Sequence, residues 1–130
     1  GSNANLLLNI GPRPDGTIQP EAAERLRAVG QWLKTYGTSI YNTHAGPVSP
    51  RAWGVTTQRG DSVFVHVLDW RDRLLAIPLV GTRVTRATML GGQEALKFEQ
   101  TAEGLSVTMP EGVANEPDRV IVLRTARAPR

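Results

Sequence analysis

The spacing of apolar positions along the chain changes near residue 51. Before this point, apolar side chains recur every three to four residues from position 20 to position 36, which is typical of a helix with one buried face. After it, apolar and polar residues alternate with a period of two over short stretches separated by turn residues. The pattern therefore predicts a helical N-terminal part and a C-terminal part made of antiparallel sheet.

The predicted helix spans residues 20–36 and carries signals at both ends. Pro20 suits the first helical position, and Glu21 and Glu24 lie in the first turns, where the helix dipole favours negative charge. Gly37 fits a left-handed residue that ends the helix. The apolar stripe, which Trp32 widens, consists of Ala22, Leu26, Val29, Leu33 and Tyr36.

Residues 6–10 are almost continuously apolar, with Asn9 as the polar exception. Such a run is typical of a parallel strand that is covered on both faces. A strand of this kind is not stable alone, so we expect it and the following helix to be the last strand and helix of a (β/α)8-type barrel whose other strands are absent here.

The C-terminal part predicts a mainly β fold, a seven- to eight-stranded antiparallel β-sandwich. Turn signals recur every eight to twelve residues, among them Gly60-Asp61, Gly91-Gly92 and Glu103-Gly104. The expected strands are residues 52–59, 62–70, 73–79, 83–90, 94–100, 105–109 and 119–125.

Composition narrows the function classes. The chain has 130 residues, a net charge of +3 and no cysteine, which excludes disulfides and thiol chemistry. Its 15 basic residues are interspersed with 12 acidic ones, which disfavours nucleic-acid binding, and no apolar run reaches the roughly 20 residues of a membrane span. We expect residues 1–4 to be the scar of a cleaved tag, residues 5–46 to be a barrel remnant with a linker, and residues 47–130 to be the sandwich.

Five segments together carry a resemblance to a known family. They read NLLLNIGPRPDGTI (5–18), WGVTT (53–57), VFVHVLDW (63–70), LAIPL (75–79) and VIVL (120–123). In order and spacing they resemble the C-terminal region of the family 29 glycoside hydrolases, the α-L-fucosidases. The chain departs from the family pattern at Arg71, where members often carry proline, and in the loop 111–118.

The resemblance implies a retaining mechanism in which an aspartate nucleophile and a glutamic acid/base stand about 5 Å apart. Both carboxylates would lie upstream of Asn5, so no catalytic residue is assigned here, nor any cofactor or metal. The implied partners are the catalytic barrel of the same polypeptide and, through it, fucosylated glycans, with no nucleic acid or membrane. The implied compartment is secreted or periplasmic for a bacterial protein and lysosomal for an animal one.

No carboxylate pair within the chain fits a catalytic role better than a structural one. Asp69 and Asp72 flank an arginine-rich turn, where ion pairing and solvation would keep both ionised. Glu21 and Glu24 are explained by their place near the helix N-terminus. In the whole enzyme Asn9 would either border the sugar site or bond to neighbouring strand ends, and we prefer the second, structural role.

The histidines predict structure rather than metal binding. His66 lies in a strand that is apolar on both faces, so we expect a central strand and a hydrogen-bonded core histidine. His44 lies in the 42–50 connection, without a partner at metal-ligand spacing.

Two function hypotheses stay open at this point. The first is a structural domain that supports the barrel and is inactive alone. The second is a carbohydrate-binding module in which Trp53 and Trp70 stack on sugar rings. We prefer a packing role for both tryptophans. We also expect the exposed apolar residues of segment 5–36 to make the chain a homo-oligomer.

Overall fold

The computed structural model describes residues 1–69, 72–110, 117–127 and 129. Within them it has one α-helix, a 3-10 turn and eight strands. The helix is α1 (Pro20–Tyr36) and the turn is η1 (Gly37–Ser39). The strands are β1 (His44–Ala45), β2 (Gly54–Arg59), β3 (Ser62–Val67), β4 (Leu74–Ile77), β5 (Val84–Met89), β6 (Phe98–Gln100), β7 (Leu105–Thr108) and β8 (Arg119–Thr125).

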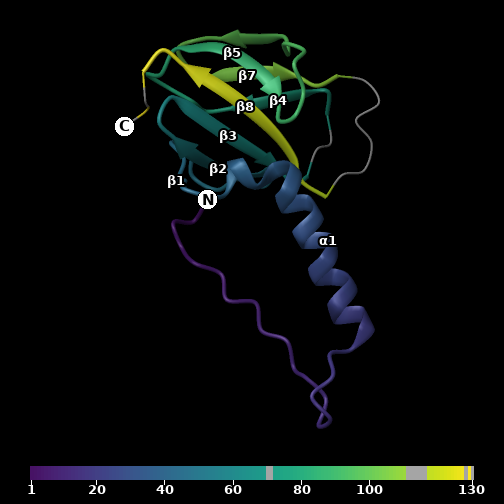
Figure 1. Ribbon diagram of the computed structural model, residues 1–130. Helices are drawn as coiled ribbons and strands as arrows, with labels where there is room; N and C mark the ends of the chain where they lie inside the picture. Colours follow the sequence, from purple (N-terminus) through teal and green to yellow (C-terminus); the bar gives the residue numbers. More distant parts are fainter. Residues whose placement is uncertain (70–71, 111–116, 128, 130) are drawn as a thin grey trace.

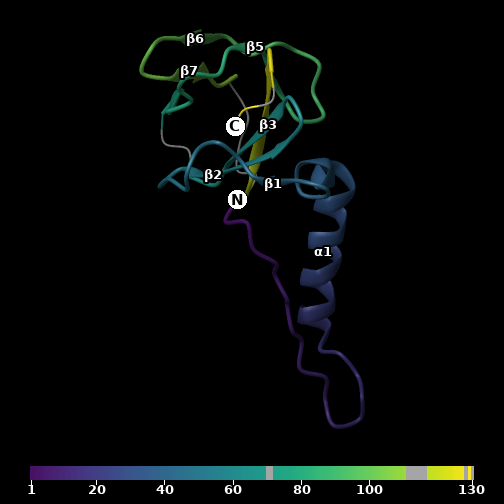
Figure 2. The same ribbon diagram turned by 90° about the vertical axis from the view of Figure 1, so that its left-hand side faces the viewer.

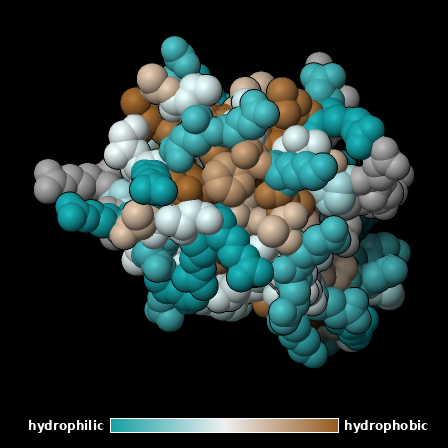
Figure 3. All heavy atoms as spheres, turned by 90° about the horizontal axis from the view of Figure 1, so that it is seen from above, coloured by the Kyte–Doolittle hydropathy of each residue, from teal (hydrophilic) through white to brown (hydrophobic). Residues whose placement is uncertain are grey.

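The strands form two antiparallel sheets that pack as a sandwich (Figures 1 and 2). The larger sheet has the order β1-β2-β3-β8-β5 and the smaller the order β4-β7-β6. The prediction of a mainly β sandwich preceded by a helix is therefore confirmed. Seen from the end opposite α1, hydrophilic residues surround a central area of hydrophobic ones (Figure 3).

The core lies between the two sheets and follows the alternation along the strands. Every second residue of β3, namely Val63, Val65 and Val67, belongs to it and is at most 1% exposed. The other residues of β3 are buried too, because the opposite face of this strand is also covered. As predicted, β3 is a central strand, paired with β2 on one side and β8 on the other.

The predicted strands correspond to β2–β8, and most prove shorter than expected. The strand expected at 94–100 begins only at Phe98, because the preceding residues contact the other sheet. Leu96 donates its N–H to the carbonyl oxygen of Ala87 in β5 (2.8 Å), after which the chain crosses to pair with β7. The two-residue strand β1 was not predicted, since two residues show no alternation.

Two glycines allow a tight turn and a close approach between strands in the larger sheet. Gly60 has φ +58° and makes the tight turn between β2 and β3, as predicted. Gly54 has φ +148°, and a side chain there would overlap the backbone carbonyl of His66 in the neighbouring strand. Glycine is therefore required directly after Trp53, where β2 begins.

The predicted bounds of α1 are confirmed, but the way it ends is not as predicted. Gly37 is not left-handed; it has φ −57° and ψ −21° and continues into η1. A β-carbon at this position would stand 2.8 Å from the ring of Tyr41, so a larger residue would have to displace this exposed ring. No helix among the described residues is long and apolar enough to cross a membrane.

The strand predicted at residues 6–10 is not formed, and that prediction is wrong for this chain. The segment is extended without strand pairing, and Leu6 and Leu7 are 87% and 93% exposed. The physical reason is that neighbouring strands, which would supply backbone partners and cover both faces, are not present. The segment leads away from the sandwich, turns, and returns as α1 (Figures 1 and 2).

Candidate functional site at the helix–sheet junction

The outer face of the larger sheet, turned away from the core, is where the helical part meets the sandwich. In β3 this face carries Phe64 and His66, which alternate with the core valines, and Thr57 of β2 is the cross-strand partner of Phe64. All three side chains are buried. Segment η1 and the last turns of α1 lie over these side chains.

Two side chains of β2 hold η1 on this face. The Oγ1 of Thr57 donates to the carbonyl oxygen of Ser39 (2.6 Å), and both residues are buried. Two positions along the strand, the Nη2 of Arg59 donates to the Oγ1 of Thr38 (2.9 Å). Because residues two apart in a strand lie on the same face, both bonds reach the same side of the sheet.

His66 links the junction to the last strand. Its Nδ1 lies 2.8 Å from Oδ2 of Asp118, the residue before β8, and its Nε2 lies 3.4 Å from Oγ1 of Thr57. On the helix side, the Trp32 ring has its centroid 6.5 Å from that of His66. His66 is 3% exposed. The predicted buried, hydrogen-bonded histidine is therefore confirmed, but it lies on the outer face of the sheet beneath α1 rather than in the core between the sheets, and it joins β2, β3 and the start of β8.

Trp53 lies elsewhere, at the start of β2. Its side chain is half-buried and packs against the core, and its carbonyl oxygen accepts the N–H groups of Leu68 (2.8 Å) and Asp69 (3.2 Å). It also lines a surface hollow of about 340 Å³ together with Asp69 and Asp72. Trp70, the second tryptophan singled out in the sequence, is outside the described residues.

The remaining candidate side chains do not converge. Glu21, Glu24 and Asn9 are exposed on α1 and the extended segment, far along the chain from the hollow at Trp53. The Nδ1 of His44 lies 2.8 Å from the carbonyl oxygen of Ala45, in β1. In the part of the chain that the structure describes, no group of three or more His, Asp or Glu side chains could hold a metal ion.

Two carboxyl groups have shifted pKa values, and both shifts have a local cause. The side-chain hydroxyl and then the backbone N–H of Thr17 donate to Asp15 and lower the pKa of its carboxyl. In the same way the hydroxyl of Thr101 lowers the pKa of Glu103. Both carboxyls are exposed, and a lowered pKa is the opposite of what a general acid needs.

Sequence reasoning missed the residues that complete the junction. Asp118 is 52 positions from His66, and no local pattern links the two. Thr57 and Ser39 are 18 positions apart, and neither belongs to a motif that would predict their contact. The one available signal was His66 itself, because a buried histidine needs hydrogen-bond partners and so predicts a polar side chain nearby.

Comparison with known proteins gives one consistent result. Residues 1–38 match the model of the α-L-fucosidase family. The chain is 40% identical over 119 residues to an α-L-fucosidase of Branchiostoma floridae, a match that covers 86% of this chain and 26% of that protein. It is 38% identical over 112 residues to the tissue α-L-fucosidase of Bos taurus, a match that covers 82% of this chain and 24% of that protein. The chain therefore spans about a quarter of the length of these relatives.

Solved structures agree over the whole fold. A family 29 α-L-fucosidase from Bacteroides thetaiotaomicron superposes with a TM-score of 0.83 at 28% identity, over 92% of this chain and 28% of that one. α-L-Fucosidase isoenzyme 1 from Paenibacillus thiaminolyticus superposes with a TM-score of 0.80 at 30% identity. This match covers 93% of this chain and 30% of that one. The chain belongs to the α-L-fucosidase family, glycoside hydrolase family 29, and corresponds to the C-terminal region of its members.

Proposed function

We propose that this chain is an accessory C-terminal region that supports the catalytic barrel of a retaining α-L-fucosidase and is inactive alone. In the whole enzyme the barrel would hydrolyse terminal α-L-fucosyl linkages. The observation that carries the proposal is the path of residues 5–36 relative to the sandwich (Figures 1 and 2). The segment 5–10 starts beside the sandwich and runs outward, and α1 returns to it and is fastened to the larger sheet.

That path resembles one strand–helix unit of a barrel. In such enzymes the active site lies at the end of the barrel where the strands finish and the helices begin. Here this end corresponds to residues 11–19, and the sandwich lies at the other end of α1. A helix of 17 residues at 1.5 Å per residue is about 25 Å long. The sandwich would thus stand well away from the bound sugar, which favours support over catalysis.

The two parts of the chain would have different roles. Residues 5–46 would complete the barrel and link it to the sandwich, and residues 47–130 would form the supporting domain. The exposed Leu6, Leu7, Leu26 and Val29 would pack against barrel neighbours in the whole enzyme. In the isolated chain, the same surface would pair with a second copy, because apolar area without cover favours association.

A carbohydrate-binding module is the second candidate, and the hollow beside Trp53 favours it. An aromatic side chain next to Asp69 and Asp72 could contact a sugar ring and accept its hydroxyl hydrogens. Packing of Trp53 against the core argues for a structural role instead. Titration with fucose and fucosylated oligosaccharides separates the two. Submillimolar affinity that is lost in Trp53→Ala would establish the binding module, and absence of binding supports the structural role.

A chimeric enzyme tests the support function. Its upstream three quarters come from the Branchiostoma floridae relative and its C-terminal quarter is this chain. We expect it to hydrolyse an aryl α-L-fucoside and to survive heating better than the upstream portion alone. An upstream portion that is as active and as heat-stable without this chain would contradict the proposal.

A further inference from the structure

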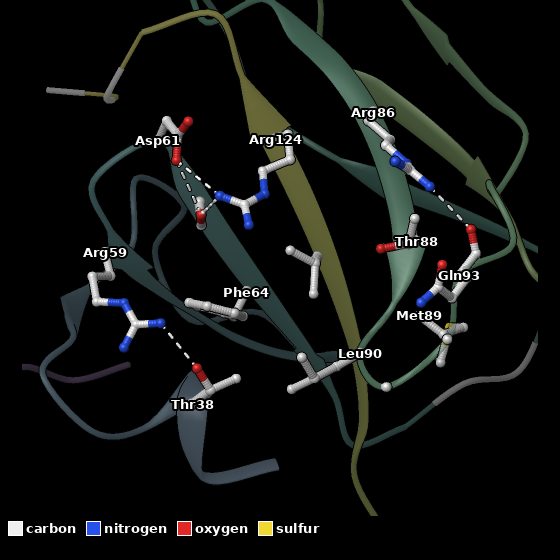
Figure 4. Close-up of a pocket in the computed structure, with 14 residues that line it drawn as sticks. Thr38, Arg59, Asp61, Phe64, Arg86, Thr88, Met89, Leu90, Gln93 and Arg124 are labelled. Atoms are coloured by element: carbon white, nitrogen blue, oxygen red, sulfur yellow. Dashed lines mark hydrogen bonds and ion pairs between the residues drawn. The ribbon is translucent and has the colours of Figure 1, made fainter. Parts of the chain in front are cut away.

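Beside η1, the outer face of the larger sheet opens into a hollow of about 520 Å³ (Figure 4). Its lining is mixed, and the apolar side chains in it include Phe64 of β3, Val122 of β8 and Leu90, which directly follows β5. Phe64 is buried. The hollow is thus a continuation of the face on which η1 already packs, since Thr38 lines it as well.

Three arginines form the rim of this hollow. Arg59, Arg86 and Arg124 come from β2, β5 and β8, and their guanidinium groups lie around the hollow in Figure 4. Arg59 also lies over the Phe64 ring, with its guanidinium carbon 6.0 Å from the ring centroid. Of the residues that line the hollow, Asp61 is the one with a carboxylate. The lining therefore has a formal charge of +2, from three guanidinium groups and one carboxylate.

The contacts within the chain leave donors on each guanidinium. Arg86 donates to the carbonyl oxygen of Gln93 (3.0 Å), and Arg124 donates to Asp61 (3.0 Å) and to the hydroxyl of Ser62 (2.6 Å). A guanidinium has five N–H donors. Half-buried apolar side chains beside guanidinium groups with free donors match the composition of protein interfaces, in which arginine is enriched and apolar contacts are combined with hydrogen bonds.

The position of the hollow indicates what would cover it. In a (β/α)8 barrel all helices run in the same direction, so the helices on either side of α1 end at the same level as α1 does. At that level α1 passes into η1 and touches the sheet. The last turn of a helix has carbonyl groups without intrahelical donors and carries partial negative charge. A neighbouring helix end would therefore meet the cationic rim directly.

We propose that this hollow is the docking site for the C-terminal end of the barrel helix adjacent to α1, with the loop that follows it. Apolar side chains of that end cover Val122 and Leu90, which are half-buried, and its carbonyl groups and acidic side chains accept hydrogen bonds from Arg86 and Arg124. The inference rests on the proposed function, because the docked helix belongs to the upstream part of the enzyme. The docked helix adds a second contact between barrel and sandwich, next to the contact made by η1. Two contacts together fix the rotation of the sandwich about the axis of α1.

Charge reversal in the chimera tests the docking site. Arg86→Glu replaces a rim arginine, and Arg83→Glu is the matched control, because Arg83 is also exposed, precedes the same strand and does not line the hollow. In the isolated chain, both variants should have the same Tm. In the chimera, Arg86→Glu should lower the Tm several degrees more than Arg83→Glu, and 1 M NaCl should narrow this difference by screening the rim.

The outcomes separate this inference from the proposed function. Equal effects of the two variants in a chimera that this chain does stabilise would overturn the docking site and leave the support function standing. Failure of the unmodified chain to stabilise the upstream portion would overturn the support function itself. A dimer of the isolated chain that dissociates in Arg86→Glu but not in Arg83→Glu would assign the hollow to a second copy, which also overturns the proposal.

Discussion

Thr57 and Ser39 are joined by a hydrogen bond of 2.6 Å between two buried residues, and this bond fastens the helical part of the chain to the sandwich. Ser39 in turn donates its own hydroxyl to the carbonyl oxygen of Tyr36 (2.7 Å), the last residue of α1. Strand β2, the end of η1 and the end of α1 are therefore connected by consecutive hydrogen bonds. A shift of α1 relative to the sheet would have to break one of them.

Thr57→Val should loosen this connection. The substitution keeps the shape of the side chain but leaves the carbonyl oxygen of Ser39 without its donor, at a cost of about 1–3 kcal/mol. We expect faster hydrogen exchange at the backbone N–H groups of Ile40 and Tyr41, which bond to Gly37. Thr85→Val is the control, because the hydroxyl of Thr85 is exposed and bonds within the sheet, to Arg124. Equal exchange at Ile40 in the two variants would disprove the anchoring role.

His66 and Asp118 should contribute to stability as a pair. Their side chains contact at 2.8 Å and are 3% and 17% exposed. We expect His66→Phe and Asp118→Ala to be non-additive in urea unfolding, with an interaction energy of about 0.5–3 kcal/mol, because each substitution removes the same bond. Strictly additive effects would mean that the contact does not stabilise the fold.

Asp15 should titrate below its ordinary range for as long as Thr17 donates to it. The pKa of its carboxyl is lowered by the Thr17 hydroxyl and backbone N–H. The ordering of this turn is therefore complete above the ordinary pKa of aspartate and is lost as the pH falls through the lowered value. Thr17→Val should move the Asp15 pKa upward in an NMR titration, while Glu103 in the same sample stays unchanged. An unmoved Asp15 would show that Thr17 is not the cause.

The isolated chain should self-associate through segment 5–36. Leu7 is 93% exposed and Val29 48%, and burying each such side chain is worth roughly 1.5–3 kcal/mol. Sedimentation at micromolar concentration should show a dimer or higher oligomer that Leu7→Asp with Val29→Asp dissociates. Leu74→Asp in β4 is the control, because Leu74 is exposed at 59% but lies on the sandwich. A monomeric unmodified chain would refute this prediction.

Local signals in the sequence predicted the sandwich well. β8 has the predicted bounds, and β3 proved central, as expected from a strand whose residues, His66 apart, are apolar or small on both faces. Prediction failed where structure depends on distant neighbours. Residues 6–10 have the composition of a buried parallel strand but make no strand pairing, and Ala95 and Leu96 pair with β5 rather than extending β6.

The junction could be predicted only in part. A buried His66 followed from the pattern of β3, but its partner Asp118 and the bond from Thr57 to Ser39 depend on how the chain folds back over the outer face. The arginines around the hollow are far apart in sequence and come from three strands, so their arrangement follows from sheet order rather than from any motif.

The most direct test of the central claim, that this region supports catalysis without performing it, is steady-state hydrolysis of an aryl α-L-fucoside by the isolated chain. We predict no turnover above that of buffer, because the catalytic carboxylates are expected upstream of Asn5. Saturable turnover by the purified chain that disappears in Asp69→Asn or Asp72→Asn would contradict the account.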